Sequence, residues 1–295
     1  MFSSENKTVD NVVEDYFVKN LLPLKDKFKN YQIAITGPIS VGKSTMLEYL
    51  YKIFNKYNFI TEAIPEYISL DPDVGIKMLG RFIKREITNT TFQNYIMDTY
   101  VSKFKSLKQE YQVCLIERLP DDSILCFANI AHKTHPEDVS LFELFVLFDK
   151  IKFCDIKYNL PSYIVKDEDK EAYKKLKIGQ DEIFNYYLRE TEAIKRQHKI
   201  NFSEIVSNEI ESTLITIMKQ IKDDISTGLY HYHIFGLSAS LETTRLRLEL
   251  RSREGESDYS DDYLNSIIKY YNNLYEVLRD PNYTIRFTEL EKLIK

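Results

Sequence analysis

The sequence predicts an α/β fold in which helices flank a parallel sheet. β-prone segments at 31–36, 59–64, 113–116 and 232–237 alternate with stretches whose apolar residues recur at helical spacing. The third of these segments is almost entirely apolar, as expected of a strand that is covered on both faces. Because parallel strands need crossover connections, and helices commonly supply them, we expect one α/β domain over 31–295.

Two regions lie outside this alternation. Residues 1–30 are polar, with Val13, Phe17 and Leu21 spaced by four, and they predict a partly helical N-terminal appendage. Residues 155–230 predict a mainly helical insertion. It contains a charge run, DEDKEAYKKLK, and an apolar stripe formed by Ile210, Leu214, Ile217, Ile221 and Ile225. We interpret the stripe as a packed helix face and the run as a solvated surface, not as binding sites.

Charge and composition exclude several classes of function. The 295 residues include 40 Lys plus Arg against 45 Asp plus Glu, and this balance argues against nucleic acid and anionic membrane as partners. No apolar run is long enough to span a bilayer, and the N-terminus does not resemble a signal peptide. Three cysteines form neither an even disulfide set nor a closely spaced metal pair, so we expect a soluble protein of the cytoplasm.

The clearest motif is GPISVGKS at 37–44, which matches the phosphate-binding pattern GxxxxGK(S/T) between a predicted strand and a predicted helix. Gly37 and Gly42 let backbone N–H groups wrap a phosphate, and Lys43 adds a cation. The Ser44 hydroxyl can bind Mg²⁺ at the start of the helix, and Thr45 is a secondary phosphate contact. The motif predicts a P-loop NTPase-type sheet that binds a nucleoside triphosphate, in particular ATP, together with Mg²⁺.

Two predicted strands are followed by acidic residues. Glu66 follows the second strand, and Glu117 ends the third, directly before Arg118. At the carboxyl edge of a parallel sheet these side chains would lie near the phosphate crevice. There Glu66 could accept a proton from a hydroxyl nucleophile, Glu117 could hold Mg²⁺, and Arg118 could bind an anion. Taken one at a time, each could instead be a capping residue or part of a structural salt bridge.

Three arginines lie in the segment RLRLELRSREGE. Arg247 and Arg251 share a helix face, and Arg253 stands near the helix end, before Gly255. Acidic residues are interleaved with them, so an exposed helix with weak intrahelical ion pairs is the simplest alternative. In a chain that also carries a phosphate-binding motif, we favour an arginine lid that closes over the triphosphate.

The ordered set GPISVGKS, IPE, TFQNY, IERLPDDS and RLRLELRSREGE resembles the deoxynucleoside kinase family. The segment IERLPDDSILCFANIA is most similar to herpesvirus-type thymidine kinases. The resemblance covers about 31–148 and 232–279 of the chain. It implies a five-stranded parallel sheet and transfer of the ATP γ-phosphate to the 5′-hydroxyl of a deoxynucleoside. Family members often form dimers, so the resemblance also allows a homodimer.

By matching motif, the resemblance implies a role for each site residue. Glu66 would be the general base, Lys43 and Arg118 would stabilise charge, and Ser44 and Glu117 would organise Mg²⁺. The implied acceptor-binding residues are Phe82, Phe92, Gln93, Phe127 and Glu256. Among these, Gln93 would hydrogen-bond the base, two phenylalanines would line the base pocket, and Glu256 would bind the sugar 3′-hydroxyl. Phe82 stands where family members usually have a sugar-binding tyrosine.

The resemblance leaves the acceptor open. Tyr100 and Ser123 occupy positions where deoxycytidine-type members have Arg and Asp, which disfavours a deoxycytidine-type specificity. The local similarity to thymidine kinases implies a pyrimidine, especially thymidine, as the substrate. One alternative is a deoxynucleoside monophosphate kinase that acts on dTMP. Another is a catalytically inactive nucleotide-binding regulator in which the insertion serves as a partner surface.

Overall fold

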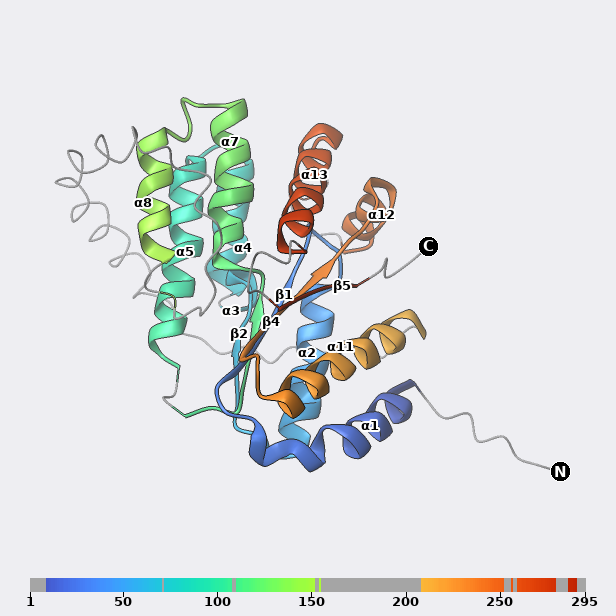
Figure 1. The fold of residues 1–295 in the computed structure, drawn as a ribbon. Helices are drawn as coiled ribbons and strands as arrows, with labels where there is room; N and C mark the ends of the chain where they lie inside the picture. The colour runs from blue at the N-terminus through green and yellow to red at the C-terminus, as the bar shows by residue number, and fades with distance from the viewer. Residues whose placement is uncertain are drawn as a thin grey trace.

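A computed structural model describes residues 9–70, 72–107, 110–151, 154, 208–251, 256, 259–279 and 286–290. At its centre is a five-stranded sheet in the order β2-β3-β1-β4-β5, and every pair of neighbouring strands is parallel. The strands are β1 (Tyr31–Thr36), β2 (Thr61–Ile64), β3 (Val113–Glu117), β4 (Tyr232–Leu237) and β5 (Arg286–Leu290). Helices surround this sheet (Figure 1). The predicted fold class is therefore confirmed.

The helices connect the strands in the expected alternation. Before β1 come α1 (Val9–Asn20) and the short η1 (Leu22–Lys27), and α2 (Lys43–Lys56) joins β1 to β2. Between β2 and β3 lie α3 (Tyr67–Leu70), α4 (Pro72–Ile83) and α5 (Asn89–Lys105). After β3 follow α6 (Pro120–Asp122), the π-helical η2 (Ser123–Ala128), α7 (Asn129–Thr134) and α8 (Leu141–Ile151). The remaining helices are α11 (Asn208–Thr227), α12 (Leu241–Arg251) and α13 (Asp261–Leu278).

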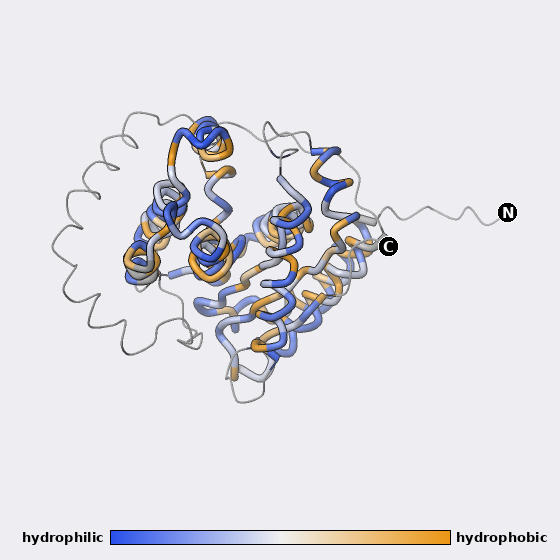
Figure 2. Tube along the Cα trace, turned by 90° about the horizontal axis from the view of Figure 1, so that it is seen from above, coloured by the Kyte–Doolittle hydropathy of each residue, from blue (hydrophilic) through white to orange (hydrophobic). Residues whose placement is uncertain are grey.

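Successive strand residues point to opposite faces of the sheet, which divides the core in two. Ile33 and Ile35 of β1 pack on the face covered by α1, α2 and α11. Ala34 packs on the other face, with residues of α5 and α13. Around the helices, hydrophobic and hydrophilic positions alternate, as expected of helices with one buried side (Figure 2). Within the described ranges, no helix is both long and apolar enough to cross a membrane.

The N-terminal helix differs from the expected appendage. Val13, Phe17 and Leu21 are fully buried and belong to the same core cluster as residues of α2 and β1. The ring of Phe17 lies 5.2 Å from that of Phe54 on α2, in an edge-to-face arrangement. Because the spacing by four puts these residues on one stripe, α1 packs with α2 and α11 in a single core cluster. The helix is therefore part of the domain.

The structure also differs from the expected insertion at 155–230, because the C-terminal part of that segment belongs to the core. Residues 155–207, including the charge run, lie outside the described residues. The apolar stripe falls on α11, where Leu214, Ile217 and Ile221 are fully buried and Ile225 is nearly so. Ile210 is partly buried against the same cluster. The interpretation of the stripe as a packed helix face is confirmed, and α11 belongs to the core layer that also contains α1 and α2.

The fifth strand is implied only by the family resemblance, and no residue pattern predicts where in the chain it lies. β5 pairs with β4 at one edge of the sheet, with His233 opposite Arg286 and Leu237 opposite Leu290. Only Leu290 is buried, whereas the other four residues of this strand are half-exposed. An edge strand with this mixed composition carries no long apolar run, which is why periodicity did not reveal it.

Candidate nucleotide-binding site

The phosphate-binding motif forms the turn between β1 and α2. Gly37 has φ +148° and Gly42 has φ +102°, conformations that disfavour any residue with a side chain. A Cβ atom on Gly37 would also lie 2.5 Å from the carbonyl oxygen of Leu237 on β4. The glycines therefore allow the loop to pass close to the sheet and present its backbone at the start of α2, where N–H groups attract an anion.

Lys43 begins α2 and is buried at this turn. Its Nζ donates a 2.6 Å hydrogen bond to the carbonyl oxygen of Pro38. Burial, followed by the positive charge of Arg118, lowers the pKa of Lys43 to about 7, although Glu66 and Glu117 act in the opposite direction. The ammonium group is thus poised to gain a negatively charged partner, because such a partner favours its protonated form.

Three oxygen-bearing groups meet beside Lys43. Ser44 Oγ donates a 2.5 Å hydrogen bond to Glu117 Oε1, and the backbone N–H of Glu66 donates to Glu117 Oε2 at 3.2 Å. Burial raises the pKa of Glu117, and the nearby Glu66 carboxylate raises it further. A hydroxyl and a carboxylate side by side match the oxygen ligands that Mg²⁺ prefers, so these residues fit the expected metal.

Arg118 connects the acidic residues to the phosphate loop. Its Nε donates to Glu66 Oε1 at 3.2 Å, and its Nη1 donates to the carbonyl oxygen of Gly37 at 3.1 Å. The guanidinium carbon also lies 4.9 Å from the ring centre of Phe127. Arg118 has φ +63°, an uncommon conformation for a residue with a side chain, which turns the chain sharply at the end of β3. Such backbone strain is often found at functional sites.

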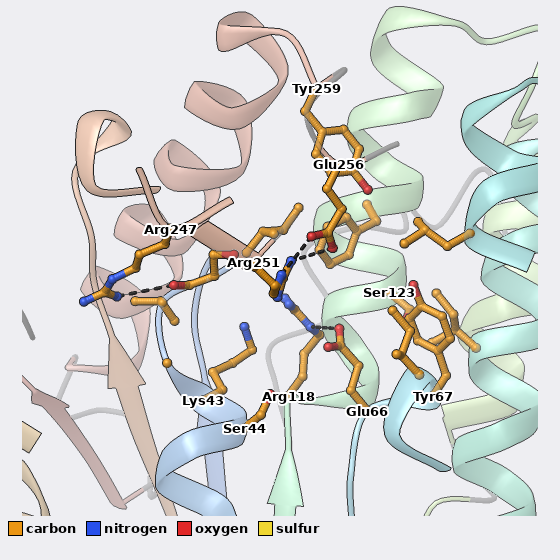
Figure 3. Close-up of a pocket in the computed structure, with 18 of the residues that line it drawn as sticks. Lys43, Ser44, Glu66, Tyr67, Arg118, Ser123, Arg247, Arg251, Glu256 and Tyr259 are labelled. Carbon is orange, nitrogen blue, oxygen red and sulfur yellow. Dashed lines mark hydrogen bonds and ion pairs between the residues drawn. The ribbon is translucent and has the colours of Figure 1, made fainter. Parts of the chain in front are cut away.

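The predicted arginine lid is only partly described. Arg251 at the end of α12 forms a two-pronged ion pair with Glu256, at 2.8 Å from Nε and 2.5 Å from Nη2 (Figure 3). Arg247 Nη1 donates to the carbonyl oxygen of Ser40 in the phosphate loop at 3.3 Å. Arg253 lies outside the described residues. Two of the three arginines thus stand next to the phosphate loop or to the predicted sugar-binding carboxylate.

These groups line a cavity of about 450 Å³. Most of the predicted site residues border it, namely Gly42, Lys43, Ser44, Thr45, Glu66, Phe82, Phe92, Gln93, Arg118, Phe127, Arg247, Arg251 and Glu256. Gly37 and Glu117 do not line the cavity, but each accepts a hydrogen bond from a residue that does: Gly37 from Arg118, and Glu117 from Ser44. The strand ends therefore converge as expected, because parallel strands place their carboxyl ends at one edge.

One part of the cavity wall, the apolar end, is formed by side chains of a single hydrophobic cluster: Ile68, Leu79, Phe82, Phe92 and Ile96. The rings of Phe82 and Phe92 stack with centres 4.7 Å apart and planes 8° from parallel. Gln93 is only 2% exposed, and its Oε1 has no hydrogen-bond partner within the described part of the chain. The hydroxyl of Tyr100 donates to the carbonyl oxygen of Glu117 at 2.8 Å. A flat heterocycle that can donate and accept hydrogen bonds would satisfy Gln93 in this place.

Sequence reasoning missed three tyrosines of this cavity. Tyr67, Tyr259 and Tyr263 all line it, and Tyr259 stands near Glu256 (Figure 3). Tyr67 directly follows Glu66, and the other two are four residues apart around the start of α13. These positions were the available signals, but with 22 tyrosines in the chain no motif distinguishes them from core aromatics.

Comparison with known proteins gives one family. The model of the deoxynucleoside kinase family matches residues 33–165. The resemblance to this family is confirmed over that segment. It contains the phosphate loop, Glu66, Gln93 and the Glu117-Arg118 pair, whereas β4, α12 and α13 lie beyond it.

One solved structure that the chain resembles is a deoxyadenosine kinase from M. mycoides, with the products dCMP and a flexible dCDP bound. The two chains are 15% identical, the comparison covers 90% of this chain and 91% of that chain, and the TM-score is 0.45. Among curated proteins, no sequence matches the chain.

Proposed function

We propose that this protein is an ATP-dependent deoxynucleoside kinase that transfers the γ-phosphate to the 5′-hydroxyl of a deoxynucleoside. One observation carries the proposal: the Glu66 carboxylate lines the same cavity as the phosphate loop, Gln93 and the apolar end. Arg118 Nε donates a hydrogen bond to this carboxylate at 3.2 Å. A carboxylate between a triphosphate site and an acceptor pocket is where a general base must be to take a proton from an attacking hydroxyl.

The other site residues support transfer by position and charge. Lys43 and the phosphate-loop backbone would bind the β- and γ-phosphates, with Thr45 as a further contact, and Arg247, Arg251 and Arg253 would neutralise the triphosphate from α12 and the residues after it. Ser44 and Glu117 would hold Mg²⁺, and the ion would supply positive charge that offsets the charge of the triphosphate. Arg118, next to Glu66, would orient the 5′ group and stabilise the charge that develops on the transferred phosphoryl.

In the proposed complex the nucleoside occupies the apolar end. Phe82, Phe92 and Phe127 would pack against the base, Gln93 would hydrogen-bond it, and Glu256 would bind the sugar 3′-hydroxyl. The similarity of IERLPDDSILCFANIA to thymidine kinases supports a pyrimidine, and thymidine in particular. A Gln93→Leu variant should bind the nucleoside less tightly, with a raised KM for the nucleoside and an unchanged KM for ATP, because the amide contacts the base alone.

A hydroxyl acceptor fits this site better than a monophosphate. The Arg118 guanidinium already bonds to Glu66 and to the carbonyl of Gly37, and Glu66 is negatively charged when it acts as a base. An acceptor phosphate placed there would meet a like charge, which disfavours dTMP.

The test is γ-phosphate transfer from ATP with Mg²⁺ to each of the four deoxynucleosides and to dTMP. We expect transfer to thymidine, and a loss of about 10² to 10⁴ in kcat for Glu66→Gln. Glu62→Gln is the matched control, because Glu62 is on β2 but does not line the cavity. Transfer to dTMP and not to thymidine would assign the monophosphate as acceptor, and ATP binding without any transfer would indicate a nucleotide-binding regulator.

A further inference from the structure

Arg118 has a third partner, on a helix that sequence motifs do not mark. Its Nη1 donates a hydrogen bond to the hydroxyl of Tyr271 on α13, 153 residues away in the chain. The guanidinium carbon also lies 5.9 Å from the centre of the Tyr271 ring. Tyr271 is fully buried and does not line the cavity, whereas Arg118 does, so this hydrogen bond links Tyr271 to the cavity.

A buried carboxylate stands behind this pair. Asp122 is 0% exposed, and its Oδ2 accepts hydrogen bonds from Thr36 Oγ1 at 2.6 Å and from the backbone N–H of Leu119 at 3.2 Å. Burial raises the pKa of Asp122, whereas Arg118 and the Tyr271 hydroxyl lower it, so both groups act on this carboxylate. Oδ1 of Asp122 has no hydrogen-bond partner among the described residues, which leaves it available to accept the Tyr271 hydroxyl proton.

The network returns to the phosphate loop. Thr36 ends β1 and directly precedes Gly37, whose carbonyl oxygen accepts from the same Arg118 Nη1. Arg118 is therefore fixed from α13, from the segment after β3 and from the loop itself. A long side chain with many rotamers loses its catalytic value when it is free to move, because its charge must already point to the reacting group.

We propose that Tyr271 and Asp122 are positioning residues that hold the Arg118 guanidinium against Glu66 and the phosphate loop. The inference rests on the proposed function in one respect, because the effect of a fixed Arg118 side chain is measured as the rate of phosphoryl transfer. The residues act on the orientation of Arg118 and not on the binding of either substrate. Their loss should therefore lower kcat and leave both KM values within about threefold of the wild type.

Tyr271→Phe removes only the hydroxyl, and Tyr275→Phe is its matched control. Tyr275 lies one turn along α13 and is equally buried. Its hydroxyl donates to two backbone carbonyl oxygens, that of Leu237 at 2.7 Å and that of Thr36 at 3.4 Å, and it is not the partner of the Arg118 guanidinium. We expect kcat to fall about 10- to 100-fold in Tyr271→Phe, and in Asp122→Asn, while Tyr275→Phe stays within about threefold at a similar loss of Tm. An equal fall of kcat in the two tyrosine variants would overturn the inference, because it would indicate a loosened helix.

A second measurement does not depend on activity. Nitrogen-15 NMR can follow exchange of the Arg118 Nε proton with water, with the signal assigned by its disappearance in Arg118→Lys. Exchange should speed up at least about tenfold in Tyr271→Phe and stay unchanged in Tyr275→Phe. If the Arg118 Nε proton exchanged in Tyr271→Phe at the wild-type rate, the positioning role would be refuted even in an active kinase. Faster exchange in a protein that phosphorylates no acceptor would instead refute the proposed function and leave the positioning of Arg118 standing.

Discussion

Ser44 and Glu117 are 73 residues apart in the chain, yet a 2.5 Å hydrogen bond joins them. Ser44 follows the phosphate loop in the first turn of α2, and Glu117 is the last residue of β3. Because β1 and β3 are neighbouring parallel strands, the loop after one and the end of the other meet at the same sheet edge. This pair is the proposed Mg²⁺ site, and neither residue could form it alone.

Replacement of Glu117 by glutamine should raise the Mg²⁺ concentration needed for half-maximal activity. The amide keeps the shape but removes the charge that attracts the cation, and loss of one metal-site group costs about 10- to 100-fold in affinity. The measurement is the initial rate over a Mg²⁺ titration at saturating ATP. Glu48→Gln on the same helix as Ser44 is the control, because Glu48 pairs with Lys52 at the surface. An unchanged Mg²⁺ requirement in Glu117→Gln would remove Glu117 from the metal site.

ATP binding should take up a proton at Lys43. With a pKa of about 7, Lys43 is mostly neutral in the empty protein at pH 8, and a triphosphate raises that pKa because it favours the charged form. Uptake should therefore approach about one proton per ATP at pH 8 and fall towards zero below pH 6. Calorimetry in two buffers of different ionisation enthalpy measures it. The pH-dependent uptake should vanish in Lys43→Met, and its persistence there would assign the proton to another group.

His233 should make stability depend on pH. Burial lowers its pKa, although its hydrogen bond with Asp224 at 2.6 Å opposes the shift. The unfolded chain, with an ordinary pKa of about 6.5, then binds more protons than the folded protein, so this contribution to stability is lost as pH falls below about 6.5.

The difference between the wild type and His233→Gln isolates that effect from other titrating groups. Between pH 7.5 and 5.5 the free energy of unfolding should fall more steeply in the wild type, by up to about 1.4 kcal/mol per pH unit. Urea denaturation at the two pH values measures this difference. Parallel slopes for the wild type and His233→Gln would contradict the prediction.

Phe17→Ala should destabilise the whole domain. Phe17 is fully buried among aromatic rings of α2 and its neighbours, so truncation leaves a cavity that costs about 3 to 5 kcal/mol. Val18→Ala is the control, because Val18 is 39% exposed and its loss should cost less than about 1 kcal/mol. Both values come from urea denaturation. If Phe17→Ala cost no more than Val18→Ala, α1 would be the appendage that composition indicated.

The local features of this protein followed from its sequence. The phosphate-binding motif predicted the turn between a strand and a helix, because glycine is the residue that best tolerates the backbone conformations at Gly37 and Gly42. The apolar residues on either side of the motif predicted the strand and the helix themselves. The same reasoning located Glu66 and Arg118 at strand ends and predicted the buried stripe of α11. These features depend on residues that are close together in the chain, and short-range patterns record them.

The tertiary structure decided what those local features meet. It made α1 a core helix, because the stripe of Val13 and Phe17 finds its partners on α2 and α11, and it added β5, whose half-exposed residues carry no pattern of their own. It also brought Tyr271 to Arg118 across 153 residues. Such pairings depend on strand order and helix packing, which bring together residues that no local spacing relates. The sequence by itself therefore indicated the candidate site residues, and the fold determined their neighbours.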